Sequence, residues 1–205
     1  MSEVPVVDIY WESPFSSAKD VKNYVDKNAP TTENNKRGQR TDYFFYQIYG
    51  QHLNNDADTL LYIGMSDVDK QKNGGNGVVN RLENHQKNWT GGLRSEIKIY
   101  IGSYGRFVDW NHWNDPENNK YYTTPLDKDN FPTIAEIEAL LIYAHKPSIN
   151  CASIRNVNAL ERCNFYLFNT GKRRSLFPEL SARYYINNEQ EKGIIDASTG
   201  ILDNN

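Results

Sequence analysis

The stretch from Asp42 to Ser66 constrains the fold more than any other part of the chain. Its first half, Tyr43 to Tyr49, is almost entirely aromatic and β-branched, and Leu60 to Gly64 is a shorter run of the same kind. Runs of this composition favour buried strands. The residues from 50 to 58 are rich in Asn and Asp and predict a loop. The stretch therefore predicts an antiparallel hairpin.

Alternation along this hairpin is expected to bring two tyrosines together. Successive side chains of a strand point to opposite faces, so every second residue shares a face. The expected sets are Phe44, Tyr46 and Ile48 on the first strand, and Leu60, Tyr62 and Gly64 on the second. Tyr46 and Tyr62 are therefore expected to stand side by side. Tyrosines are common in strands, so the hairpin alone indicates only a core that contains a sheet.

An amphipathic helix is predicted farther along the chain. Val78, Leu82, His85 and Trp89 recur at the spacing of one helical face. Arg81 lies one turn before His85 on the same helix. Taken by itself, this pattern indicates a helix that carries an Arg and a His on its polar edge.

The residues from Thr133 to His145 predict a second helix, with two glutamates in different settings. Thr133 and Glu136 have the spacing of a capping box, which gives Glu136 a structural role. Glu138 has apolar residues at i−4, i+3 and i+4. A carboxylate beside an apolar stripe costs several kcal/mol unless it is paired or bound to a cation. Glu138 is thus either an Arg-paired buried carboxylate or a metal ligand.

Four segments, in this order along the chain, resemble the motifs of the GIY-YIG nuclease superfamily. They are Phe44-Phe45-Tyr46-Gln47-Ile48, Tyr62-Ile63-Gly64, Arg81-Leu82-Glu83-Asn84-His85, and the run from Glu138 to Asn150. The last segment is similar to the corresponding part of the nuclease domain of bacterial excision-repair nucleases. The resemblance covers about residues 40 to 153.

The chain departs from the family pattern in two places. Phe44 stands where the family usually has its first glycine, which is a backbone residue and takes no part in the chemistry. The spacing from Gly64 to Arg81 is longer than in compact members, because residues 67–77 form an insertion rich in glycine. Tyr49 offers an alternative register for the motif tyrosine, but the Tyr-Gln-Ile order favours Tyr46.

The resemblance implies the cleavage of phosphodiester bonds with a divalent cation. Such a site binds a cation, activates water and offsets charge on the phosphoryl oxygens. Glu138 is the implied single protein ligand of Mg²⁺ or Mn²⁺, which keeps most of its waters. Arg81 is the implied phosphate-binding residue. The products implied by the family carry a 5′-phosphate and a 3′-hydroxyl.

The remaining implied roles fall to four residues. Tyr46 is a candidate base, although a free tyrosine has a pKa of about 10 that a cation would have to lower. His85 is the competing base, because its pKa is closer to neutrality. Tyr62 is expected to orient the phosphate or water, and Asn150 to hold the site together by hydrogen bonds.

The expected fold class is mixed α+β, with a small, mostly antiparallel sheet flanked by helices. Residues 1–39 are assigned to an N-terminal extension, 40–153 to the catalytic core and 154–205 to a C-terminal extension. The core carries insertions near 67–77 and 104–131. Further elements are expected as a helix at 17–26, a strand at 96–103, a strand at 165–168, a turn at 169–171 and a short helix at 178–185.

Charge is unevenly distributed along the chain, whose net charge is −3. An acidic balance is not typical of nucleic-acid binders. Residues 151–185, however, carry six basic and two acidic side chains, and the tail from 186 is acidic. Lys172, Arg173 and Arg174 are the densest basic cluster and are expected to contact the phosphates of duplex DNA. Basic runs are more often plain solvated surface.

Composition excludes several classes of protein. Hydrophobic residues make up 38% of the chain, which indicates a globular and not a disordered protein. No run approaches the ~20 apolar residues of a membrane span, and the N-terminus lacks the features of a signal peptide. Cys151 and Cys163 lack metal-ligand spacing and suggest no disulfide framework. A cytoplasmic location is expected, and the oligomeric state, a homodimer included, stays open.

Three functions remain open at this point. The first is a stand-alone restriction endonuclease, and the second is a repair or mobile-element nuclease. The third is a catalytically inactive DNA-binding or interaction module. The presence of all six implied site residues counts against the third.

Overall fold

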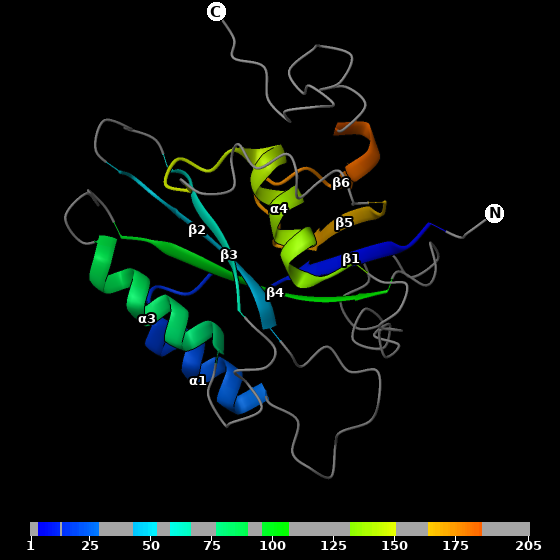
Figure 1. The fold of residues 1–205 in the computed structure, drawn as a ribbon. Coiled ribbons are helices and arrows are strands. Elements are labelled where there is room, and N and C mark those ends of the chain that lie inside the picture. Colours follow the sequence, from blue (N-terminus) through cyan, green and yellow to red (C-terminus); the bar gives the residue numbers. More distant parts are fainter. Residues whose placement is uncertain are drawn as a thin grey trace, which may run out of the picture.

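The computed structural model describes residues 4–12, 14–28, 43–52, 58–66, 77–89, 96–106, 132–150 and 164–185. Its helices and strands form one mixed α+β arrangement, as expected from the sequence (Figure 1). The strands are β1 (Val6–Trp11), β2 (Tyr43–Gly50), β3 (Thr59–Met65), β4 (Lys98–Arg106), β5 (Tyr166–Gly171) and β6 (Glu179–Ser181). The helices are α1 (Ala18–Asn28), α3 (Gly77–Trp89) and α4 (Ile134–His145).

The strands build a single six-stranded sheet in the order β3-β2-β4-β1-β5-β6. All neighbours are antiparallel except β1 and β5, which pair in parallel. The predicted hairpin is β2 and β3, and the predicted strand at 96–103 is β4, paired with β2. The strand β1, from the segment assigned to the N-terminal extension, lies between β4 and β5.

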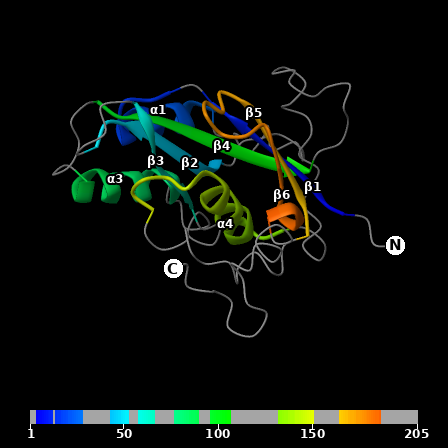
Figure 2. The ribbon, with the colours of Figure 1, turned by 90° about the horizontal axis from the view of Figure 1, so that it is seen from above.

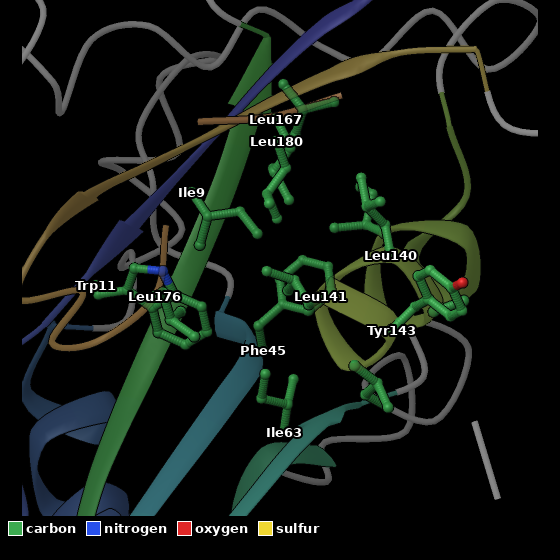
Figure 3. Packing of buried hydrophobic residues seen from close by; sticks show 14 of the residues in the cluster. Ile9, Trp11, Phe45, Ile63, Leu140, Leu141, Tyr143, Leu167, Leu176 and Leu180 are labelled. Carbon is green, nitrogen blue, oxygen red and sulfur yellow. The ribbon is translucent and has the colours of Figure 1, made fainter. Parts of the chain in front are cut away.

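Both faces of the sheet are covered. One apolar cluster joins the sheet to α4, and Figure 3 shows Leu141 of α4 pointing toward Phe45 of β2, with Ile63 of β3 beside it. A second cluster joins the other face to α1 and α3 through residues such as Val21 and Leu82. Viewed from above, the strands run between α1 and α4 (Figure 2). The site residues of β2 and β3 therefore sit in a sheet that is held from both sides.

Two β-bulges break the alternation expected for the hairpin. In the pairing of β2 with β4, Tyr43 faces Ser103 and Phe45 faces Gly102, so Phe44 is an extra residue. Phe44 consequently joins the cluster under α4, whereas Tyr46 and Ile48 face α3. The prediction that Phe44 shares a face with Tyr46 is wrong, because a bulge inserts one residue and reverses the side-chain direction.

The second bulge lies on β3. Ile48 pairs with Tyr62, and Tyr49 pairs with Leu60, so Leu61 is the extra residue. Leu60 packs against the α4 cluster and Tyr62 against the α3 cluster. The prediction that these two share a face is wrong for the same reason.

The predicted capping box of α4 is confirmed. The Thr133 hydroxyl accepts a hydrogen bond from the Glu136 N–H at 3.2 Å, and the Thr133 N–H donates to the Glu136 carboxylate at 2.7 Å. These two bonds satisfy donors that a helix N-terminus otherwise leaves unpaired. The first turn of α4 is therefore fixed, and so is the starting point from which Glu138 projects.

The predicted turn at 169–171 is wrong. These residues extend β5, because Asn169 and Thr170 find buried partners on β1. The Trp11 indole N–H donates to Asn169 Oδ1 at 3.0 Å, and the Thr170 hydroxyl donates to Asp8 Oδ1 at 3.0 Å. These buried hydrogen bonds hold Asn169 in the strand despite its turn preference, and Thr is a favoured strand residue in its own right.

The short helix predicted at 178–185 is mostly wrong, because residues 179–181 form β6 and only 182–185 are helical. Leu180 is buried and pairs with Leu167 of β5, so tertiary packing decides the local structure. The predicted helix at 17–26 is confirmed as α1. The insertions at 67–77 and 104–131 fall outside the described residues except at their edges, and both cysteines do so entirely.

Candidate active site

The centre of the site is a pair of stacked tyrosines on β2 and β3. The Tyr46 and Tyr62 rings lie 5.9 Å apart between centroids and are inclined by 20°. Tyr46 pairs directly with Gly64, and its ring lies over that glycine. A Cβ at position 64 would come within 2.4 Å of the Tyr46 Cζ and hydroxyl atoms, and within 2.7 Å of Tyr62 Cε1. The absence of a side chain at Gly64 is what allows the two phenols to pack this closely.

The hydroxyl of Tyr46 is in an unusual position. Tyr46 is fully buried, and its hydroxyl has no hydrogen-bond partner of good geometry among the described residues. The Tyr62 hydroxyl lies within hydrogen-bonding reach, and this interaction raises the pKa of Tyr46 and lowers that of Tyr62. The bond is poorly aligned, so the buried Tyr46 hydroxyl is poorly satisfied. A buried polar group of this kind calls for an explanation, and a catalytic role is one.

Burial raises the pKa of the Tyr46 hydroxyl above its ordinary value, and the neighbouring Tyr62 raises it further. Arg81 lowers it, but not enough to offset burial. The pKa of Tyr62 is also raised, mainly by burial and then by the charge of Glu138. Both phenols are therefore protonated near neutral pH and available as hydrogen-bond donors.

The helix α3 brings His85 and Arg81 to these tyrosines. The His85 ring centroid lies 4.8 Å from that of Tyr62 and 6.0 Å from that of Tyr46. Burial and then the positive charge of Arg81 lower the pKa of His85. The imidazole is thus neutral at neutral pH and able to accept a proton. Arg81 itself is exposed on α3, and its positive charge lowers the pKa values of Tyr46 and Glu138.

The helix α4 contributes Glu138, which is half-buried near the end of β3. Burial raises the pKa of its carboxyl group, while a hydrogen bond from the Met65 N–H and the charge of Arg81 lower it. The charge of Glu138 acts on both Tyr46 and Tyr62. Five of the six predicted site residues therefore interact in one place.

Asn150, the sixth predicted residue, lies behind this group. Its Oδ1 accepts the Ile63 N–H at 2.9 Å, and its Nδ2 donates to the Ile63 carbonyl at 2.9 Å. The preceding backbone continues the pattern, since the Ile149 N–H donates to the Leu61 carbonyl at 2.8 Å. Asn150 thus binds the outer edge of β3 between Tyr62 and Gly64. It is 5% exposed, so its function here is to position the strand.

The basic cluster does not form part of this group. Arg173 donates hydrogen bonds to the carbonyls of Arg174 and Leu176, so its guanidinium braces the turn that contains it. Arg174 pairs with Asp58 at 3.2 Å. Lys172 is exposed, and its side chain makes no ion pair within the described residues. The three residues predicted to bind DNA therefore differ in how freely their charges can act.

The residues present fit a hydrated hard cation. Within the described ranges, no group of three or more His, Cys, Asp or Glu side chains could hold a metal ion. Mg²⁺ needs no such group, because it is usually bound by one or two carboxylates and keeps several waters. Glu138 offers one carboxylate, and burial disfavours its charged form. A bound cation would favour that charged form again. Glu138 would hold the ion, and the neighbouring Arg81 would bind the phosphate.

The steric role of Gly64 and the Met65 hydrogen bond to Glu138 were not predicted. The glycine of the Tyr62-Ile63-Gly64 motif could have indicated the steric role, since close approach of a side chain to the backbone requires Gly. No sequence signal exists for the second.

Comparison of the chain with models of protein families, with curated proteins and with solved structures finds no significant match. No helix in the described parts of the chain is long and apolar enough to cross a membrane.

Proposed function

We propose that this protein is an endonuclease that hydrolyses phosphodiester bonds of duplex DNA with Mg²⁺ or Mn²⁺, through a site of the GIY-YIG type. One observation carries the proposal. Two stacked tyrosines, a half-buried neutral histidine, an arginine and a desolvated carboxylate converge from four separate elements. Strained or costly polar groups of this kind are typical of functional sites.

Each residue has a role that its surroundings support. Arg81 is always charged and exposed, so it binds phosphate oxygens and offsets the charge that develops on them. Tyr46 and Tyr62 keep their protons and donate hydrogen bonds to the phosphate or to the attacking water. Glu138 would hold the divalent cation, which would supply charge stabilisation at the phosphate and lower the pKa of a bound water. Asn150 holds the β3 edge on which Tyr62 stands.

His85 is the proposed general base. It is neutral at neutral pH, because burial and Arg81 lower its pKa, whereas burial raises that of Tyr46. A general base works best when its pKa lies near the operating pH, because it is then unprotonated and still basic enough to take a proton. This choice between the two candidates does not depend on whether the enzyme acts in restriction, in repair or in a mobile element.

The pH dependence of the chemical step distinguishes the two bases. With His85 as the base, the single-turnover rate should rise with pH and level off by about pH 6.5, since the neutral form predominates above a pKa that lies below this ordinary value. Rates are measured from pH 5 to 9 at saturating Mg²⁺ and excess protein. A rate that keeps rising tenfold per pH unit up to pH 9 would assign the base to Tyr46 or to a water.

The function itself is tested with a long natural DNA of varied sequence, such as phage genomic DNA. Purified protein should cut it with Mg²⁺ or Mn²⁺ and leave it intact with an excess of chelator. Cleavage that persists in chelator would contradict the proposed cation requirement.

A further inference from the structure

Arg174 adopts a backbone conformation that is unfavourable for its residue type. Its φ is 57°, and it lies in a turn closed by a hydrogen bond from the Leu176 N–H to the Arg173 carbonyl at 3.1 Å. Turn positions with positive φ favour Gly or Asn, and another residue there costs about 1 kcal/mol or more. A residue kept at such a cost has a use for its side chain.

The guanidinium of Arg174 is held in a fixed place at one end of the sheet. Its Cζ lies 5.1 Å from the ring centroid of Tyr49 and 5.9 Å from that of Tyr100. The Tyr49 hydroxyl is bonded in turn to Ser175, at 2.7 Å to its hydroxyl and 3.2 Å to its N–H. The Arg174 side chain nevertheless remains 40% exposed, so it is pre-organised and accessible.

One carboxylate joins Arg174 to a second cation. Asp58 Oδ2 lies 3.2 Å from Arg174 Nη2 and 2.6 Å from Lys98 Nζ. Asp58, Lys98 and Arg174, here called the Asp58 cluster, come from three distant parts of the chain. Arg and Lys side chains bind phosphate oxygens through charge-assisted hydrogen bonds of the same kind.

We propose that the Asp58 cluster is a contact site for the phosphate backbone of duplex DNA, and that Asp58 occupies the anion position in the free protein. The proposal rests on the proposed function in taking DNA as the polyanion. Asp58 then acts as an internal competitor. Removing its charge exposes Lys98 and Arg174 and tightens binding, whereas removing either cation weakens it.

The Asp58 cluster and the stacked tyrosines lie on opposite faces of the sheet. Tyr49 and Tyr100, which pack under Arg174, belong to the apolar cluster beneath α4, whereas Tyr46 belongs to the cluster beneath α3. The Asp58 cluster is therefore a DNA contact separate from the cleavage site, and binding is the property that tests it.

The test is an equilibrium titration of a fluorescent 30-base-pair duplex in chelator, with every variant built on Glu138→Gln. Asp58→Asn should lower the Kd about threefold or more, and the salt slope should steepen. Lys98→Ala and Arg174→Gly should raise the Kd and each reduce the salt slope by about 0.9. Glycine is the residue that the turn at 174 prefers, so Arg174→Gly removes the charge without straining the fold. Thermal melts check folding.

Asp26→Asn is the matched control, because Asp26 is also an exposed carboxylate paired with a lysine, Lys22, but lies on α1. It makes the same change in net charge and should alter the Kd by less than about twofold. An equal effect of Asp58→Asn and Asp26→Asn, weaker binding by Asp58→Asn, or unchanged salt slopes for both cation variants would overturn the proposal. So would an effect of Asp58→Asn on anionic lipid vesicles alone.

Binding in chelator does not depend on cleavage, so the two proposals fail separately. A protein that cuts DNA but tolerates all three substitutions loses the contact site and keeps the nuclease. A protein that binds DNA through this cluster but never cuts it loses the nuclease and keeps the contact site.

Discussion

Replacing Gly64 with alanine should reduce DNA cleavage by about 100-fold or more, because displacement of reacting groups by about 1 Å costs on that order. The new Cβ would lie 2.4 Å from the Tyr46 Cζ and hydroxyl atoms. Tyr46 is fully buried and pressed between β2, β3 and α3, so it cannot move away without disturbing Tyr62 and His85. Overpacking of this kind also lowers stability by about 1–3 kcal/mol.

Gly50→Ala is the matched control for this substitution. Gly50 is the last residue of β2, the strand that carries Tyr46. A Cβ there would lie 3.2 Å from Leu61 Cδ1, 3.4 Å from Ile97 Cγ2 and 3.7 Å from the Glu96 carbonyl oxygen, so it makes no contact as short as those at Gly64. Its cleavage rate should stay close to that of the unaltered protein. Single-turnover rates and denaturant melts of both variants make the comparison. Full activity of Gly64→Ala would show that the close contact of Tyr46 with β3 is irrelevant to cleavage.

The two glutamates of α4 should respond in opposite ways. Glu138→Ala should abolish cleavage and leave the free energy of unfolding, measured in chelator, unchanged or higher, because a desolvated carboxylate is removed. Glu136→Ala should keep cleavage and lose about 0.5–1 kcal/mol of stability, because Glu136 completes the capping box with Thr133. The helix, the residue type and the substitution are the same, so only position differs.

Both variants need a cleavage assay and a urea melt in chelator. Loss of cleavage in Glu136→Ala together with full cleavage in Glu138→Ala would show that Glu138 has been wrongly assigned as the metal ligand. The register from Glu138 through Asn150 would then be wrong as well.

Local patterns predicted the elements that depend on neighbouring residues. Apolar periodicity gave the hairpin strands and α3, and the Thr133 and Glu136 spacing gave the start of α4. These elements bring Tyr46, Tyr62 and His85 together because the hairpin fixes two of them and one helical face presents the third.

Features that depend on distant residues were not predictable. The bulges at Phe44 in β2 and Leu61 in β3 lie in the pairing of β2 with its two neighbours, and no residue pattern within either strand marks them. Asn169 and Thr170 have turn composition but become strand through contacts with β1. Arg174 and Asp58 are 116 residues apart, so a basic run in sequence did not reveal that one of its charges is already paired.

The most direct test of the proposed active site compares the unaltered protein with Glu138→Gln, prepared identically, on the same DNA in Mg²⁺. The proposed site predicts that the unaltered protein cuts, that chelator stops it, and that Glu138→Gln is inactive although it melts normally and still binds DNA. The identical preparation excludes a contaminating nuclease as the source of cleavage. Equal cleavage by both proteins, or none by the unaltered protein on any duplex with Mg²⁺ or Mn²⁺, would contradict it.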